Sequence, residues 1–405
     1  MNIVFVEPFF PHNQRRFVHA LAGVGANVIG VGEYSEHELG DELRGQMGAY
    51  YKVSNVTDIG QLNAATEWAQ NLAWIDRLES TIEAHQMAAA QVREARGIPG
   101  TSVRTTWLCR DKPSMKEALR QAGVPTAAST AAHNADEVID FANRIGFPLI
   151  LKPRAGAGAQ GTTRVDSMAE LQAALASFGS ADSIAVEEFV EGHEGFYDTI
   201  TIDGHIVHDW MTHYYPNVLE AMRHRWISPQ FVTTNRIEDS LFYSEVRELG
   251  SRVIEALGIP TSATHMEWFY GPKGLRFSEI GCRPPGVGAW DLYSAANDVD
   301  VYREWAHAIV HGSPENKLSR QYSAGIVALR PEQDGQIRGY SGLDEINERH
   351  GRWIIDAHLP NPGTPTQPVE AGYMANAYIR MRHPDYDTLR GMLDEAGRTV
   401  RVHAG

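Results

Sequence analysis

Residues 264–286 read THMEWFYGPKGLRFSEIGCRPPG, and this stretch decides the fold of the central region. Two runs rich in aromatic and β-branched residues flank the turn at 271–274, a pattern that predicts a β-hairpin. With the turn centred near Lys273, Glu267 faces Glu279 across the ladder. Two carboxylates directly opposite each other repel. A hard divalent cation between them removes the repulsion, because such cations take oxygen ligands. The pair is a candidate metal site.

Arg283 follows this hairpin, four residues after Glu279. Its planar guanidinium can hold a phosphate or a carboxylate with two parallel hydrogen bonds. A solvated hairpin with scattered charge is the alternative interpretation. The exit Arg-Pro-Pro-Gly at 283–286 and the lysines upstream favour a binding site instead.

The bulk composition limits the class of protein. A chain of 405 residues with 43% hydrophobic and 21% charged residues is typical of two to four folded domains. The net charge of −15 argues against nucleic acid or an anionic membrane as the main partner, because both need a basic face. Cys109 and Cys282 are the only cysteines, so no disulfide framework or thiolate zinc site is expected, and Cys282 is expected to pack. No signal-type segment opens the chain, which predicts a cytoplasmic protein.

The periodicity predicts three domains. A strand at 2–6, a helix at 14–23 and a strand at 27–31 form a βαβ start, typical of a doubly wound α/β domain. The turn after the first strand lacks Gly-x-Gly-x-x-Gly, so no dinucleotide site is predicted there. Residues 59–96 are rich in Ala, Gln, Glu and Leu and are predicted to be helical. The predicted domains are an N-terminal α/β domain at 1–108, a central α+β domain at 109–312 and a β-rich α+β domain at 313–405.

The central domain carries a glycine-rich segment between two predicted strands. Asp111 is a natural N-cap for a helix that runs to about Gln121. The other elements expected before residue 191 are helices at 135–145 and 168–178, and strands at 147–153, 162–165 and 183–190. The loop at 154–161 contains Gly156, Gly158 and Gly161, whose small size lets backbone N–H groups approach phosphate oxygens. A flexible hairpin tip explains the same composition equally well.

Two lysines favour the phosphate interpretation. Lys152 ends an apolar strand, where a buried ammonium is costly unless it meets an anion. Lys112 supplies a second cation. Two cations, a glycine loop and a metal hairpin are the parts that hold a nucleoside triphosphate with its magnesium.

Residues 186–194, VEEFVEGHE, supply candidates for the nucleoside. Glu187 can accept from the adenine amino group, and the backbone of Glu188 and Val190 can contact the ring. Glu194 can accept from the ribose hydroxyls. An acidic loop without a ligand is the alternative for this segment alone.

The order of these motifs resembles the ATP-grasp superfamily over about 111–312. The motifs are Asp111-Lys112, Leu151-Lys152-Pro153 with its glycine loop, residues 186–194, Glu267 and Glu279-x-x-x-Arg283. The resemblance is to the carboxylate–amine ligases of this superfamily, including the L-amino acid ligases, with the overall architecture of biotin carboxylase. It implies a pre-ATP-grasp domain before a two-subdomain ATP-grasp fold.

The resemblance also implies a role for each candidate residue. Lys112 and Lys152 would bind the α- and β-phosphates of ATP under a lid formed by 154–161. Glu267 and Glu279 would bind Mg²⁺, with Mn²⁺ as an alternative, and Arg283 would stabilise an acyl phosphate. The sequence departs from the family at Gly281, where Asn is frequent, and at Ala159, where Ser is frequent.

The implied reaction joins a small carboxylate to an amine through an acyl phosphate, with release of ADP and phosphate. His213, Arg223 and Arg225 lie in an aromatic and basic stretch at 208–228 and are candidates for substrate binding, although a charged sheet edge explains the stretch as well. The alternatives are an ATP-dependent carboxylase subunit and a non-catalytic nucleotide-binding regulator. Similar proteins suggest a homodimer.

Overall fold

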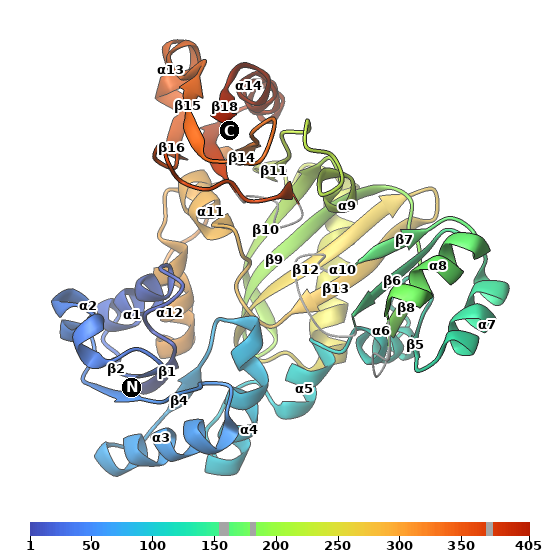
Figure 1. Ribbon diagram of the computed structural model, residues 1–405. Helices are drawn as coiled ribbons and strands as arrows, with labels where there is room; N and C mark the ends of the chain where they lie inside the picture. The colour runs from blue at the N-terminus through green and yellow to red at the C-terminus, as the bar shows by residue number, and fades with distance from the viewer. Residues whose placement is uncertain (154–161, 179–183, 370–375) are drawn as a thin grey trace.

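The structure is a computed structural model that describes residues 1–153, 162–178, 184–369 and 376–405. Within these residues the strands form a parallel sheet of four strands, an antiparallel sheet of eight, a second sheet of four and a ribbon of two. The eight-stranded sheet lies at the centre, with the parallel sheet and the small sheet on opposite sides of it (Figure 1). The mixed α/β and α+β fold class is therefore confirmed.

The N-terminal unit is the parallel sheet, in the order β3-β2-β1-β4, with its helices. The elements are β1 Asn2–Val6, α1 Gln14–Gly23, β2 Asn27–Gly32, α2 Asp41–Gly45, β3 Ala49–Lys52, α3 Ile59–Leu72, β4 Arg77–Glu79, α4 Gln86–Arg96 and α5 Val103–Leu108. The predicted βαβ start is confirmed. The all-helical expectation for 59–96 is wrong at β4, because three residues are too short to show a period and they pair with β1 through tertiary contact.

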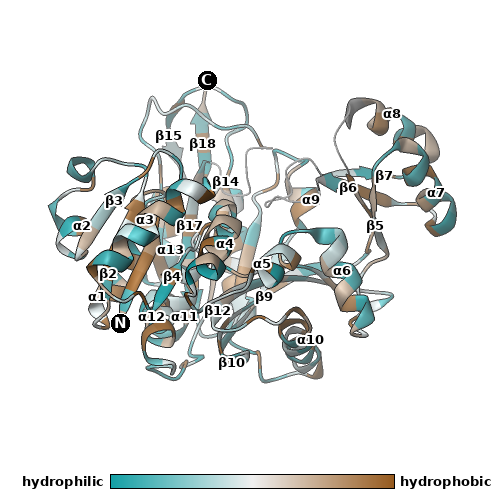
Figure 2. Cartoon of the chain, turned by 90° about the horizontal axis from the view of Figure 1, so that it is seen from below, coloured by the Kyte–Doolittle hydropathy of each residue, from teal (hydrophilic) through white to brown (hydrophobic). Residues whose placement is uncertain are grey.

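The small sheet has the order β5-β8-β6-β7 and belongs to the first half of the central region. Its elements are α6 Lys112–Gln121, β5 Ser129–Ala132, α7 Ala135–Ile145, β6 Leu149–Pro153, β7 Thr163–Val165, α8 Met168–Phe178 and β8 Ile184–Glu188. The helices α7 and α8 lie on one side of this sheet (Figures 1 and 2) and share a core with it. Asp111 caps α6 as predicted, because its carboxylate accepts from the Ser114 N–H.

The large sheet has the order β13-β12-β9-β10-β11-β14-β17-β16. Its strands, with the helices between them, are β9 His193–Ile202, β10 His205–Tyr215, α9 Val218–Ala221, β11 Gln230–Thr234, α10 Leu241–Leu257, β12 Ser262–Gly271, β13 Gly274–Gly281, α11 Ala289–Asn297, α12 Val301–His311, β14 Ser323–Leu329, α13 Leu343–His350, β16 Ile354–His358, β17 Ala377–His383 and α14 Tyr386–Thr399. The two-stranded ribbon pairs β15 Ile337–Ser341 with β18 Arg401–Ala404. Strands on both sides of residue 312 therefore share one sheet. The three domain boundaries stay predictions.

The two faces of the large sheet have different neighbours. Tyr197, Met211 and Met266 pack in one buried cluster with α10 residues such as Val253. Because side chains alternate along a strand, the residues between these point to the opposite face, where the site described below lies. Figure 2 shows brown, hydrophobic strands such as β2 beneath helices with teal outer surfaces. Within the described part of the chain, no helix combines the length and apolar character needed to cross a membrane.

Candidate functional site

The predicted carboxylate pair forms on the hairpin of β12 and β13. Glu267 is the direct cross-strand partner of Glu279, and the register shifts immediately after this pair. The bulge re-aims the neighbouring side chains, a common device beside binding sites. In the adjacent strand β9, Glu194 pairs with Phe269, two residues from Glu267 and on the same face. Three carboxylates therefore converge on the face opposite α10.

The charges of these carboxylates are poorly balanced. Burial and the Glu279 carboxylate raise the pKa of Glu267. Burial, together with the charge of Glu267, raises the pKa of Glu194 to about 8. Burial opposes ionisation of Glu279 as well, but Lys112 and Lys152 outweigh it and lower its pKa. A cation beside Glu267 and Glu279 would relieve this repulsion.

The donors available here fit magnesium. Both candidate ligands are carboxylates, and Mg²⁺ is commonly bound by one or two carboxylates together with water and substrate phosphates. Over the described ranges, no group of three His, Cys, Asp or Glu side chains forms a complete metal site. The remaining ligands would therefore come from a bound nucleotide and water.

The lysines of the site are held by acidic partners. Lys112 Nζ lies 3.2 Å from Glu279 Oε2. Lys152 Nζ lies 2.8 Å from Glu187 Oε2, and Lys116 Nζ lies 2.7 Å from the same oxygen. The register of β6 and β8 pairs Ile150 with Glu187, so Lys152 is a diagonal neighbour of Glu187 on one face.

Lys116 was not among the site residues predicted from the sequence, although its spacing from Lys112 indicated a shared helix face. It stands four residues after Lys112 on α6, and residues at that spacing share a helix face. Its side chain is only 1% exposed. Burial and the charge of Lys152 lower the pKa of Lys116 to about 8, although the Glu187 carboxylate opposes this shift. The two lysines outweigh the effect of burial on Glu187 and lower its pKa to about 2.

The residues predicted for the nucleoside lie around one cavity. Glu187 Oε1 is buried and has no hydrogen-bond partner in the described structure, so it is open to a donor such as an adenine amino group. Glu188 accepts from Lys273 and from the Ala128 N–H. Val190 lines the cavity, and Glu194 Oε2 accepts from the Val218 N–H at 2.7 Å. Gly156, Gly158, Ala159 and Gly161 lie outside the described residues.

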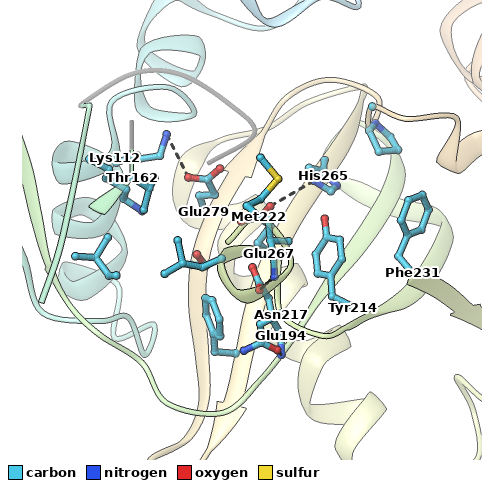
Figure 3. Close-up of a pocket in the computed structure, with 18 of the residues that line it drawn as sticks. Lys112, Thr162, Glu194, Tyr214, Asn217, Met222, Phe231, His265, Glu267 and Glu279 are labelled. Carbon is cyan, nitrogen blue, oxygen red and sulfur yellow. Dashed lines mark hydrogen bonds and ion pairs between the residues drawn. The ribbon is translucent and has the colours of Figure 1, made fainter. Parts of the chain in front are cut away.

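The cavity has a volume of about 910 Å³ and two chemically different halves. Figure 3 places Lys112 and Thr162 on one side of Glu267 and Glu279, and His265, Tyr214 and Phe231 on the other, with Met222 between Glu279 and His265. We call the side of Lys112 the charged half and the side of the aromatic residues Tyr214 and Phe231 the apolar half. Glu267 and Glu279 lie between them.

Arg283 lines this cavity from the segment after β13. Its Nε donates to Glu83 Oε2 at 2.8 Å, and its Nη1 donates to the Pro284 carbonyl at 2.8 Å. Gln14 and Thr81 of the N-terminal unit also line the cavity, and their side chains hydrogen-bond to each other at 2.8 Å. The sequence reasoning missed these N-terminal residues, because nothing local relates them to the hairpin.

Residues 117–298 match the model of the ATP-grasp domain family. The L-arginine-specific L-amino acid ligase of Bacillus subtilis is 23% identical over 318 residues, which cover 76% of this chain and 75% of that protein. A solved L-amino acid ligase from Bacillus licheniformis superposes with a TM-score of 0.78 at 17% identity, over 100% of this chain and 98% of that one. The central region of this chain is an ATP-grasp domain.

ATP-grasp ligases form carbon–nitrogen bonds, and the relatives named here are consistent with the carboxylate–amine ligase type. The biotin carboxylase domain of the Hydrogenobacter thermophilus 2-oxoglutarate carboxylase, solved as a dimer with MgADP, ADP and bicarbonate, shares the fold. It superposes with a TM-score of 0.67 at 19% identity, over 99% of this chain and 90% of that one. ATP-grasp enzymes use ATP and Mg²⁺, in agreement with the chemistry of the charged half of the cavity.

The three residues predicted to bind the substrate of this ATP-grasp ligase separate in space. Arg223 lines the cavity. Arg225 instead pairs with Asp334 at 2.6 Å, and His213 lies on the α10 side of β10, where it contacts Tyr243. Neighbouring strand residues point to opposite faces, which explains why Tyr214 lines the cavity and His213 does not. Arg225 and His213 are therefore not assigned to the substrate.

The two cysteines of the ATP-grasp ligase meet in its core. Cys109 and Cys282 are free and buried, with their Sγ atoms 2.9 Å apart. Contact with Cys282 and burial raise the pKa of the Cys109 thiol well above its ordinary value. The expectation that Cys282 packs in the interior is confirmed.

His213 is expected to make the free energy of unfolding of the enzyme fall at acid pH. Its ring contacts His193 at 2.9 Å and Tyr243 at 3.0 Å. Burial and His193 lower the pKa of His213 from 6.5 to about 3. The unfolded chain therefore binds this proton first, and the free energy of unfolding falls as the pH drops from 6.5 towards 3. His213 contributes about 1.4 kcal/mol per pH unit to this fall.

Urea unfolding across this pH range checks the expectation with the variant His213→Gln. The variant should show a shallower loss of stability than the wild type. His205→Gln, at an exposed position of the same strand, is the control and should keep the wild-type slope. Equal slopes for His213→Gln and the wild type would contradict the assignment.

Proposed function

We propose that this chain is an ATP-dependent carboxylate–amine ligase that forms an amide or peptide bond between amino-acid-like substrates and releases ADP and phosphate. One observation carries the proposal. A single cavity is lined by three lysines, by the paired carboxylates of Glu267 and Glu279, and by Arg283. The similarity to L-amino acid ligases supports amino-acid-like substrates.

The residues divide the work between phosphate transfer and amide formation. Lys112, Lys116 and Lys152 neutralise phosphate oxygens as charge shifts towards ADP. Magnesium on Glu267 and Glu279 would supply further charge neutralisation. A substrate carboxylate in the apolar half takes the γ-phosphoryl group and becomes an acyl phosphate.

Amide formation follows in the apolar half. The amine attacks the activated carbonyl, and phosphate leaves. Arg283 stabilises the oxygen charge that develops on the carbonyl. The apolar walls limit the access of water, which would otherwise hydrolyse the acyl phosphate. Homodimer formation stays a prediction for this chain.

The proposal is tested by ADP release from ATP and Mg²⁺ across amino acids offered singly and in pairs, with mass spectrometry of every positive sample. A pair-dependent product lighter than the sum of its substrates by one water supports the ligase. ADP release that depends on bicarbonate and on no amine would instead favour a carboxylase. ATP binding without turnover for any acid and amine would favour a regulator.

Met222 is expected to influence the choice of substrate. It follows α9 and lies between Glu279 and His265, at the border of the apolar half of the cavity (Figure 3). Met222→Trp fills part of this space, so the Michaelis constant of a bulky co-substrate should rise by about tenfold while that of ATP changes by less than about twofold. Steady-state kinetics with both substrates varied checks this.

The control for Met222→Trp is Trp226→Ala, which removes a side chain that is 79% exposed on the same segment. Its Michaelis constants should match the wild type. If Met222→Trp left the constants of every accepted co-substrate unchanged, the apolar half would not be the substrate chamber.

A further inference from the structure

The guanidinium of Arg283 is held at two of its three nitrogens. Nε donates to Glu83, Nη1 donates to the carbonyl of Pro284, and the side chain is only 16% exposed. Both contacts constrain the plane of the guanidinium. The Nη2 group takes no part in these two contacts, and the Arg283 side chain lines the cavity. The direction of the Nη2 N–H groups therefore depends on what holds Nε.

Glu83 reaches Arg283 from a different unit of the chain. It belongs to the short 3-10 turn Glu83–His85, which leads directly into α4, while Arg283 lies 200 residues later. Its other carboxylate oxygen, Oε1, accepts from Arg110 Nε at 3.2 Å. Both oxygens of Glu83 are therefore engaged by arginines, and α4 packs its buried residues into the core of the N-terminal unit. The packing of α4 therefore fixes the position of the Glu83 carboxylate for Arg283.

Gly281 provides the space for this contact. A Cβ atom at Gly281 would lie 3.4 Å from Arg283 Cγ and 3.5 Å from Glu83 Oε2. A longer side chain at this position would extend into the region where the carboxylate and the guanidinium meet. The glycine that departs from the usual ATP-grasp pattern is therefore compatible with the Glu83–Arg283 pair, and a larger residue would compete with it.

We infer that Glu83 is a positioning residue, which aims the Arg283 guanidinium at the reacting carbonyl and so makes the N-terminal unit a part of the catalytic machinery. The inference rests on the role of Arg283 in the proposed function. Arg283 keeps its charge without Glu83, so nucleotide binding is preserved. Its fork is no longer held in one orientation, and a small misplacement of such a group costs up to about a hundredfold in rate.

The kinetic test uses Glu83→Gln, which keeps the shape of the side chain and removes its charge. The rate constant of substrate-dependent ADP release should fall by about 10- to 100-fold, while the Michaelis constant of ATP stays within about twofold of the wild type. In an Arg283→Lys background, Glu83→Gln should add less than about twofold, because the group through which it acts is already gone. A kinetic defect of full size in that background would overturn the inference.

Heteronuclear NMR of the arginine Nε–H groups gives a readout that does not require turnover. The Arg283 signal, identified by its absence from Arg283→Lys, should be sharp and slow to exchange in the wild type and broad or shifted in Glu83→Gln. An unchanged Arg283 signal in Glu83→Gln would overturn the inference. If the wild type released ADP without forming an amide, the proposed function would fail, and this signal would still decide the positioning role.

Arg110→Gln is the matched control, because it removes the partner of the other Glu83 oxygen and lies outside the cavity lining. It should keep the Arg283 signal and a rate within about threefold of the wild type. Glu83→Asp keeps the charge on a shorter side chain, and it replaces Glu83→Gln in both measurements if that variant does not fold. It should give an intermediate rate and an altered Arg283 signal, and wild-type values of both would overturn the inference.

Discussion

Arg283→Ala is expected to lower the rate of amide formation by about 10²- to 10³-fold while ATP binds with nearly unchanged affinity. Arg283 lines the cavity and acts electrostatically on His265, whereas Lys112, a predicted phosphate ligand, lies on the far side of Glu279 from His265 (Figure 3). The oxygen charge that Arg283 stabilises develops only in the transition state, so its loss should reduce the rate constant more than substrate affinity. Steady-state kinetics and calorimetric titration with a non-hydrolysable ATP analogue measure the two effects.

Two further variants test whether the loss of rate is specific to the Arg283 guanidinium. Arg276→Ala removes an arginine from β13 of the same hairpin, where Nη1 donates to the Leu275 carbonyl and the side chain does not line the cavity. It should retain the wild-type rate. Arg283→Lys restores a positive charge without the planar fork and should recover only a small part of the activity. Wild-type product formation by Arg283→Ala would remove Arg283 from the mechanism.

Glu187→Gln is expected to lower the free energy of unfolding by about 3–5 kcal/mol, because it leaves two buried ammonium groups without their shared carboxylate. Lys116 and Lys152 both contact Glu187 Oε2, at 2.7 and 2.8 Å. The same variant should bind ATP poorly, since the lysines then lack a fixed orientation. Urea unfolding measures the first effect, and calorimetric titration with the ATP analogue measures the second.

The stabilisation that Glu187 provides is expected to decrease at acid pH. The pKa of Glu187 is lowered from 4.5 to about 2 in the folded state, because Lys116 and Lys152 outweigh burial. The stabilisation is therefore complete above pH 4.5 and is lost as the pH falls from 4.5 towards 2. Glu187→Gln should lack this component. Glu117→Gln, on the exposed face of α6, is the control and should change stability by less than about 0.5 kcal/mol. A similarly small effect of Glu187→Gln would contradict the assignment.

Local patterns predicted much of the fold. The βαβ start, the Asp111 cap and the hairpin that pairs Glu267 with Glu279 all depend on residues close together in the chain. Turn residues, caps and side-chain periodicity act over such distances, so they can be read from the sequence. The strand Arg77–Glu79 was missed because three residues carry no period. The strands that continue the large sheet past residue 312 gave no local sign of the sheet they would join.

The residues of the candidate site also differ in whether the sequence or only the tertiary structure identifies them. The amino-acid sequence by itself determined the class of chemistry, since the order of lysines, glycine loop, paired glutamates and Arg283 is a property of the chain. Only the tertiary structure decided that Lys116 shares Glu187 with Lys152, and that Glu83 holds Arg283. These contacts join segments up to 200 residues apart, and their geometry depends on how the sheets pack rather than on any local preference. The same packing turned His213 away from the cavity and Tyr214 towards it.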